Sequence, residues 1–322
     1  MNVVEHGNLG DQASISGERI AYLNGAYIKE RDARISIYDR GFTMSDAAYD
    51  VARTYGHKPH KFEEHVDRLY RSLRYLQVDP KITQQEMLDI SLEVNRQNVQ
   101  LLDPAGDHRM VWRVTRGVGK QLPGFGGADV GPTVLVHNDP LPWDSWAQHY
   151  IDGGHLVIAG TRASDPQSVD PKGKLHNRLP HVLADLEAKR VDPAAIGLLL
   201  DMRGCVAEAT KANFFMVAGG KLLTPQRGSA LLGVTRATIL ELAGTLGIEA
   251  IEQDLYVHDV YNADEVFLSV TSPFIQPISR VDTMPVRETC PGPVTKQLVA
   301  AFSEQVGVDI VQQALHNARR AE

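Results

Sequence analysis

The first part of the chain combines the apolar spacing of helices with the alternation of strands. Alternation runs through Asn24–Gly25, a pair that favours a tight β-hairpin turn. Thr83 is followed by Glu86 three residues later, which is the capping-box signature of a helix start. The elements expected here are a hairpin over 18–28, helices over 62–78 and 83–98, and strands over 110–115 and 132–137. Together they predict a small α/β unit.

A segment rich in proline, aspartate and asparagine, HNDPLPWDSW, then interrupts the pattern at residues 137–146. Beyond it, we expect strands over 156–160, 196–200, 205–208, 214–217, 221–223 and 266–270, and helices over 179–190, 234–246 and 294–306. Many short strands with scattered helices favour an α+β, barrel-like domain over a doubly wound sheet. We therefore expect a small domain over 1–137, a linker over 138–146 and a large domain over 147–322.

The composition of the 322-residue chain is that of an ordinary globular protein, with 43% hydrophobic and 23% charged residues. Its net charge of −7 argues against nucleic-acid binding, and we expect the pair Arg319–Arg320 to form a frayed tail. The chain contains no long apolar run, and residues 1–15 lack a signal-peptide pattern, so no membrane span is expected. Two cysteines, Cys205 and Cys290, fit a cytoplasmic protein without a disulfide scaffold or a metal site.

Two segments carry charges that suit catalysis. Lys172 and Lys174 precede a predicted helix in the run KGKLHN, and a lysine that forms a Schiff base must be partly desolvated or close to other cations. Glu208 lies between two apolar strands in the run EATKANFF, where a carboxylate needs a cationic partner. Taken alone, both segments are more simply explained as solvated surface charge.

Two further segments suit the binding of an anion. Gly233, Val234 and Thr235 open a predicted helix, and the free N–H groups of a helix start bind phosphate. The Gly-Lys-Ser/Thr ending of a P-loop is absent. Thr271 and Ser272 end a predicted strand, where hydroxyl and N–H groups can reach a phosphate or a carboxylate. Taken alone, an ordinary glycine turn and a polar strand end explain them.

In this order, the four segments resemble the class IV (fold type IV) aminotransferases. The shared pattern is a lysine with Asn three residues on, then E-x-x-x-x-N, then G-(I/V)-T-R, then a threonine at a strand end. The runs ARISIYDRGF at 33–42 and HVDRL at 65–69 extend the resemblance, which covers roughly residues 20–305. The family includes branched-chain aminotransferases, D-amino-acid aminotransferases, (R)-selective amine transaminases and aminodeoxychorismate lyases.

The resemblance implies an enzyme that uses pyridoxal 5'-phosphate, held between a small α/β domain and a larger α+β domain. It implies that Lys174 forms the Schiff base with the cofactor and that Glu208 faces its pyridine nitrogen. The implied phosphate-binding residues are Arg68, Val234, Thr235 and Thr271, the middle two mainly through backbone N–H groups. It also implies a homodimer in which each subunit donates residues to its partner's pocket.

The run SDAAYDV at 45–51 is most similar to the S-D-x-T-Y-D-V of (R)-selective amine transaminases, although Met44 and Ala48 depart from that group. The loop 117–123 lacks the Arg-x-His that traps a carboxylate in D-amino-acid enzymes. Trp112 and Arg113 do not match a typical branched-chain enzyme. We expect the substrate pocket to include Tyr49, Val51, Arg53, Trp112, Lys120 and Ser272. Arg53 or Lys120 is expected to bind a carboxylate, with an exposed strand arginine as the alternative for Arg53.

Three activities remain open at this point. The leading one is transfer of an amino group from an (R)-amine or a D-amino acid to a 2-oxo acid such as pyruvate. The second is a branched-chain L-amino-acid aminotransferase. The third is a C–O lyase similar to aminodeoxychorismate lyase, which would release pyruvate without any amino acceptor. A non-catalytic scaffold is disfavoured because every position that the family uses for its cofactor is filled.

Overall fold

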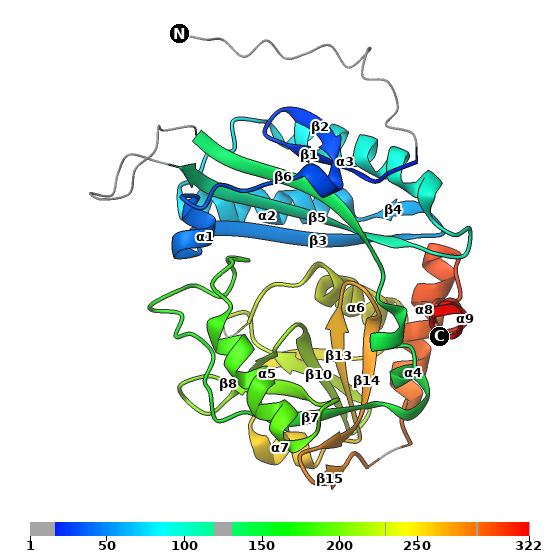
Figure 1. The fold of residues 1–322 in the computed structure, drawn as a ribbon. Helices are drawn as coiled ribbons and strands as arrows, with labels where there is room; N and C mark the ends of the chain where they lie inside the picture. Colours follow the sequence, from blue (N-terminus) through cyan, green and yellow to red (C-terminus); the bar gives the residue numbers. More distant parts are fainter. Residues whose placement is uncertain (1–16, 119–130, 229, 288, 322) are drawn as a thin grey trace. The chain divides into compact units, whose positions relative to one another are not determined.

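The computed structural model describes residues 17–118, 131–228, 230–287 and 289–321 (Figure 1). These residues form two compact units. Unit 1 takes residues 1–140 together with Leu175–Asn177, and unit 2 takes Leu141–Lys174 together with Arg178–Glu322. The chain leaves unit 1 after Pro140, within the segment where we expected a linker. That segment has regular structure, because strand β6 (Gly131–Pro140) enters it and a 3-10 turn, η3, covers Trp143–Ser145.

Unit 1 is built on a six-stranded antiparallel sheet in the order β2-β1-β6-β5-β3-β4. Asn24 and Gly25 both adopt positive φ values, of 49° and 96°, and they join β1 to β2 as a two-residue hairpin. The predicted hairpin is therefore confirmed. The six strands of the sheet are β1 Ile20–Leu23, β2 Ala26–Lys29, β3 Ala47–Tyr55, β4 Lys58–His60, β5 His108–Val118 and β6 Gly131–Pro140.

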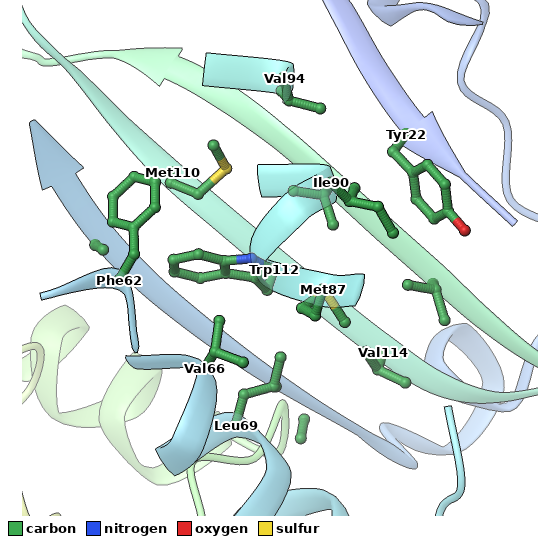
Figure 2. Packing of buried hydrophobic residues seen from close by; sticks show 14 of the residues in the cluster. Tyr22, Phe62, Val66, Leu69, Met87, Ile90, Val94, Met110, Trp112 and Val114 are labelled. Carbon is green, nitrogen blue, oxygen red and sulfur yellow. The ribbon is translucent and has the colours of Figure 1, made fainter. Parts of the chain in front are cut away.

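Two long helices, α2 (Phe62–Leu76) and α3 (Gln84–Asn98), pack on one face of this sheet. The capping box at the start of α3 is formed as predicted, since Thr83 and Glu86 bond reciprocally. Even-numbered residues of β3, β5 and β6 point at the helices and form the core, and odd-numbered residues point to the other face. Figure 2 shows this core around Trp112. The short helices of unit 1 are η1 (Glu30–Asp32), α1 (Arg40–Met44) and η2 (Val99–Leu101).

Unit 2 contains a nine-stranded mixed sheet in the order β12-β11-β10-β13-β14-β7-β8-β9, with β15 pairing to β14 off this path. Two isolated bridges, from Ala209 to Ala212 and from Cys205 to Tyr256, bring β9 at one end of this order back towards β10 and the segment that follows β12. The sheet is therefore curled, as the barrel-like prediction required. Its strands are β7 Gly154–Ile158, β8 Ile196–Leu200, β9 Val206–Ala209, β10 Asn213–Ala218, β11 Lys221–Pro225, β12 Ala250–Gln253, β13 Glu265–Val270, β14 Phe274–Val281 and β15 Met284–Pro285.

Unit 2 contains the three helices that the sequence predicts, α5 Leu179–Val191, α6 Val234–Thr245 and α8 Pro293–Val306. Among the described residues it contains three more α-helices, α4 His149–Asp152, α7 Val257–Tyr261 and α9 Ile310–Ala321. The expectation of a frayed tail at Arg319–Arg320 is wrong. Both arginines lie in α9, which buries Ile310, Ala314 and Asn317 along one side at helical spacing. Within the described ranges, no helix is long and apolar enough to cross a membrane.

Candidate active site

The two candidate lysines differ in their surroundings. Lys172 is exposed, its Nζ lies 3.2 Å from Oδ2 of Asp170, and its N–H donates to Oδ1 of the same residue at 2.9 Å. Lys174 is only partly exposed. Directly after it, the chain is pinned within unit 1, because the N–H of His176 donates to the carbonyl of Ala47 at 3.0 Å. A partly desolvated and positioned amine is the better nucleophile, which supports the prediction for Lys174.

Glu208 on β9 is 7% exposed and has three partners inside unit 2. Nε2 of His181 lies 2.8 Å from its Oε1, the N–H of Leu231 donates to Oε2 at 3.2 Å, and Nη1 of Arg178 lies 3.7 Å from Oε1. Burial raises the pKa of Glu208, but the hydrogen bond from His181 and the charge of Arg178 outweigh it and lower the pKa. The carboxylate is therefore ionised at neutral pH, as a partner of a protonated pyridine must be.

Arg178 and His181 are site residues that the sequence reasoning missed. Arg178 is the N-cap residue of α5 and also donates from Nη2 to the carbonyl of Thr210 at 2.8 Å. Three residues on, His181 lies in the first turn, on the same side of the helix. Its Nδ1 atom is buried and finds no hydrogen-bond partner among the described residues. The signal was present in the sequence as a basic pair at (i, i+3) spacing shortly after Lys174.

The predicted phosphate-binding segment Gly233–Thr235 lies where a loop of unit 2 enters α6. Gly233 is the N-cap of α6, and no side chain of the described residues caps the first turn there. Asn213 holds the loop, since its Nδ2 donates to the carbonyl of Leu231 at 2.7 Å. A Cβ atom on Gly233 would lie 2.2 Å from Oδ1 of the same asparagine, so only glycine fits. Asn213 also pairs with Ser269 across β10 and β13, which ties the loop to the strand end before Thr271.

This arrangement fits pyridoxal phosphate. The uncapped N–H groups of Val234 and Thr235 suit a phosphate, and both residues, like Thr271 and Ser272, are partly exposed. Glu208 supplies an ionised carboxylate connected to the same loop through Leu231. The chemistry of the donor set therefore matches both ends of the cofactor, an anionic phosphate and a basic ring nitrogen.

Arg68 lies on α2 in unit 1 and is 4% exposed. Its Nε and Nη2 atoms bond to the two carboxylate oxygens of Asp50 at 2.8 and 2.7 Å. Nδ1 of His65 lies 2.7 Å from the same carboxylate. Arg68 therefore already fastens α2 to β3, and its predicted contact with phosphate stays a prediction.

The two faces of the unit 1 sheet separate the expected pocket residues. Tyr49 and Val51 are partly exposed on the face away from α2 and α3, where the Tyr49 ring meets His176 edge-on at 5.1 Å between centroids. Trp112 points the opposite way, into the core, and its Nε1 donates to Oγ of Ser91 at 2.7 Å (Figure 2). The expectation that Trp112 lines the substrate pocket is therefore wrong, because its position in β5 turns it towards the helices.

Of the two cations expected to bind a substrate carboxylate, Arg53 is engaged inside unit 1. Arg53 is 2% exposed, so it is not an exposed strand arginine. Its Nη2 lies 3.6 Å from Oδ2 of Asp107, and its guanidinium stacks 3.9 Å from the centre of the Tyr55 ring. An internal carboxylate therefore already neutralises Arg53. Lys120 lies outside the described residues.

Comparisons with known proteins agree with this geometry. The model of the family described as amino-transferase class IV matches residues 47–281. A putative branched-chain-amino-acid aminotransferase of Methanocaldococcus jannaschii is 35% identical over 287 residues, which cover 88% of this chain and 95% of that protein. A D-alanine aminotransferase of Staphylococcus aureus is 27% identical over 288 residues, covering 88% and 97%.

Solved structures give the same picture. The branched-chain aminotransferase of Escherichia coli superposes with a TM-score of 0.81 at 27% identity, covering 89% of this chain and 94% of that one. The pyridoxal-phosphate form of the Thermobaculum terrenum enzyme has a TM-score of 0.78 at 25% identity, covering 90% and 94%. Since the family model spans most of the chain and the M. jannaschii relative is 35% identical over most of it, this chain belongs to the class IV aminotransferases and is a pyridoxal-phosphate-dependent aminotransferase.

Proposed function

We propose that this enzyme transfers the amino group of an apolar amino acid, of the branched-chain type, to a 2-oxo acid. The observation that carries the proposal is a cavity of about 410 Å³ in unit 1 whose walls are largely apolar and include His176. Since His176 follows Lys174 by two residues, their Cα atoms are at most about 7.6 Å apart. An apolar side chain gains free energy by burial in such a cavity. The branched-chain names of the relatives from M. jannaschii and E. coli support this choice.

The chain's own residues divide the work as follows. Pyridoxal phosphate, when bound, holds the amino nitrogen of the donor and takes up the electrons freed at its Cα. Lys174 would act as the general base that takes up and delivers the proton of the donor Cα. Glu208 keeps the proton on the ring nitrogen, while His181 and Arg178 keep Glu208 ionised. The N–H groups of Val234 and Thr235 hold the phosphate in place while the substrates exchange.

A second candidate is transfer from a D-amino acid or an (R)-amine to pyruvate. The run SDAAYDV at 45–51 favours it, as does the likeness to the D-alanine aminotransferase of S. aureus. A panel of L-leucine, D-alanine and (R)-1-phenylethylamine, each with pyruvate or 2-oxoglutarate, separates the two. The cofactor absorbance should change fastest with L-leucine. Rapid change with D-alanine or the (R)-amine, and none with L-leucine, would transfer the assignment to the second candidate. Pyruvate released without an acceptor would indicate the lyase.

We also propose that the enzyme works as a homodimer in the cytoplasm. Two described surfaces support the dimer. One is on unit 1, where Ile37 and Phe42 are 70% and 75% exposed. The other is the α5 stripe, which we define as four exposed apolar residues at helical spacing, namely Leu179, Val182, Leu183 and Leu186. Both cysteines are free thiols, which suits a reducing compartment.

A further inference from the structure

The cavity in unit 1 holds one cation that the sequence reasoning left unused. Arg113 on β5 pairs with Tyr49 on β3 and with Leu135 on β6. Its parity in the strand is opposite to that of Trp112, so its side chain lies on the face away from the helices. There it lines the cavity together with apolar walls from Ile35, Ile37 and Phe42.

Within the described ranges, no carboxylate pairs with the Arg113 guanidinium. Asp39, an acidic residue of the described cavity wall, is fully buried and its carboxylate accepts hydrogen bonds from other groups. Thr115 and Thr133 donate their hydroxyls to its Oδ2 at 2.9 and 2.6 Å, and the N–H of Gly41 donates to Oδ1 at 2.7 Å. Burial lowers the pKa of Arg113, because desolvation of the cation outweighs the opposing charge of Asp139. An anion entering the cavity would relieve this penalty.

Two side chains, His137 and Asp139, orient the guanidinium of Arg113 through hydrogen bonds. Nη1 of Arg113 donates to Nε2 of His137 at 2.5 Å, which requires that nitrogen to be an acceptor. Nδ1 of His137 then carries the proton, and it lies 3.2 Å from Oδ1 of Asp139. Arg109 pairs with the same aspartate at 3.1 Å. His137 and Asp139 therefore fix the orientation of Arg113 without neutralising it through a direct ion pair.

The cavity wall also offers a neutral polar group beside the reactive segment. Burial lowers the pKa of His176 to about 4, with the charge of Arg113 as the next cause, so its imidazole is neutral at pH 7. Its Nε2 atom is buried and has no hydrogen-bond partner in the part of the chain that the structure describes. A ligand in the cavity would thus meet a cation without a direct ion pair and an unsatisfied ring nitrogen of His176, two residues after Lys174.

We propose that Arg113 binds the carboxylate of the amino-acid and 2-oxo-acid substrates, with His137 as its positioning residue. The inference rests on the proposed function and adds the group that recognises the substrate class. It replaces Arg53, whose guanidinium is held by Asp107. The apolar walls formed by Ile35, Ile37 and Phe42 then receive the substrate side chain.

The test compares substrates with and without a carboxylate in the two half-reactions of the intact holoenzyme. Arg113→Gln should weaken the binding of pyruvate and of the unreactive 3-methylbutanoate by about ten- to a hundred-fold, since a charge-assisted hydrogen bond is lost. The half-reaction with isopentylamine, which has no carboxylate, should keep its rate. Arg113→Lys should restore part of the carboxylate binding. His137→Phe should weaken carboxylates less than Arg113→Gln does.

The matched control is Arg96→Gln, which removes an exposed arginine of α3 that pairs with Glu93, outside the cavity and outside the hydrogen bonds that orient Arg113. It should leave carboxylate binding unchanged. Equal losses for 3-methylbutanoate and isopentylamine, or no loss for either, would overturn the role of Arg113 while the parent still transaminates. If the parent accepts no amino acid at all, the proposed function fails instead, and the two failures are distinct. Thermal unfolding of each variant identifies a loss that is due to misfolding.

Discussion

At the scale of single residues, the partners of Glu208 decide the pH range in which the enzyme works. The pKa of Glu208 is lowered, so its ionised form persists above that pKa and is lost as the pH falls through it. Removing the hydrogen bond from His181 should raise this pKa. We therefore expect His181→Phe to move the acid limb of the kcat profile to higher pH.

The comparison for this prediction is His181→Gln, which retains an N–H donor and should restore part of the profile. A third variant, Glu208→Gln, should keep its cofactor but lose about ten- to a hundred-fold in kcat at every pH, because a neutral amide cannot hold a protonated pyridine. An acid limb that does not move in His181→Phe would remove His181 from the site.

The identity of the reactive lysine is a second prediction at this scale. Borohydride reduction of the holoenzyme followed by peptide mapping should place the cofactor label on Lys174. Lys172→Ala is the matched control, because Lys172 is exposed and already paired with Asp170, and it should retain label and activity. A label on Lys172 would contradict the assignment.

At the scale of elements, α2 and β3 are joined by the buried pair of Arg68 and Asp50. The pair lowers the pKa of Asp50 well below its usual range; burial opposes this, and the charge of Arg68 dominates. Removal of Arg68 takes away the guanidinium that balances the buried Asp50 carboxylate, which then keeps its contact with His65. We expect Arg68→Ala to cost about 3–5 kcal/mol in unfolding free energy, in addition to weakening cofactor retention. Urea unfolding of the apoenzyme measures the first effect, and dialysis of the holoenzyme the second.

The same pair sets a pH dependence of stability. A carboxyl with a depressed folded pKa stabilises the protein above its unfolded pKa of about 3.9, and the contribution is lost as the pH falls towards the folded pKa. Asp50→Asn should therefore flatten the loss of stability below about pH 4. An identical acid slope in parent and Asp50→Asn would show that this carboxyl does not govern it.

The start of α6 gives another prediction at the scale of elements. A methyl group on Gly233 would collide with Oδ1 of Asn213 at 2.2 Å, so Gly233→Ala should displace the loop and weaken cofactor binding. Gly244→Ala in the same helix is the control, since no described atom lies within 4 Å of its added Cβ. The control should gain up to about 1 kcal/mol of stability from helix propensity. Equal cofactor affinity in both variants would argue against a cradle at Gly233.

At the scale of the whole molecule, light scattering should give a dimer. Val182→Glu places a charge in the α5 stripe and should shift the protein towards monomer, with a loss of activity. The control is Leu92→Glu, which changes a leucine on α3 that is 48% exposed, and it should leave the dimer intact. A monomeric and fully active parent would refute the dimer.

The sequence predicted the positions of helices and strands better than it predicted which face of each strand is buried. The segments with clear periodicity, such as α2 and the Asn24–Gly25 hairpin, were predictable because one side of each is buried. Strand alternation shows that Trp112 and Arg113 face opposite ways, but only the position of the helices decides which one is inside. β14 shows no alternation, since its first five residues are buried and Pro277 interrupts them.

The site could be predicted where a motif fixes the backbone, and not where tertiary contacts choose a partner. Lys174, Glu208 and Gly233 lie in short motifs that became predictive together, through their resemblance to the class IV aminotransferases. The pairing of Arg53 with Asp107 joins residues far apart in the sequence, and no local pattern announces it. His181 carried a local signal in its spacing from Arg178, but its pairing with Glu208 became visible only in the folded chain.

The return of Leu175–Asn177 to unit 1 has a consequence for how the protein is made. The sheet that these residues join is complete in sequence at Pro140, yet it receives them only after more of the chain has left the ribosome. The bridge between Ala48 and Leu175 is a long-range contact of the kind that forms late. We therefore expect the segment that carries Lys174 to be anchored only after all six strands of this sheet have been made, and a chain truncated before it lacks the predicted reactive lysine.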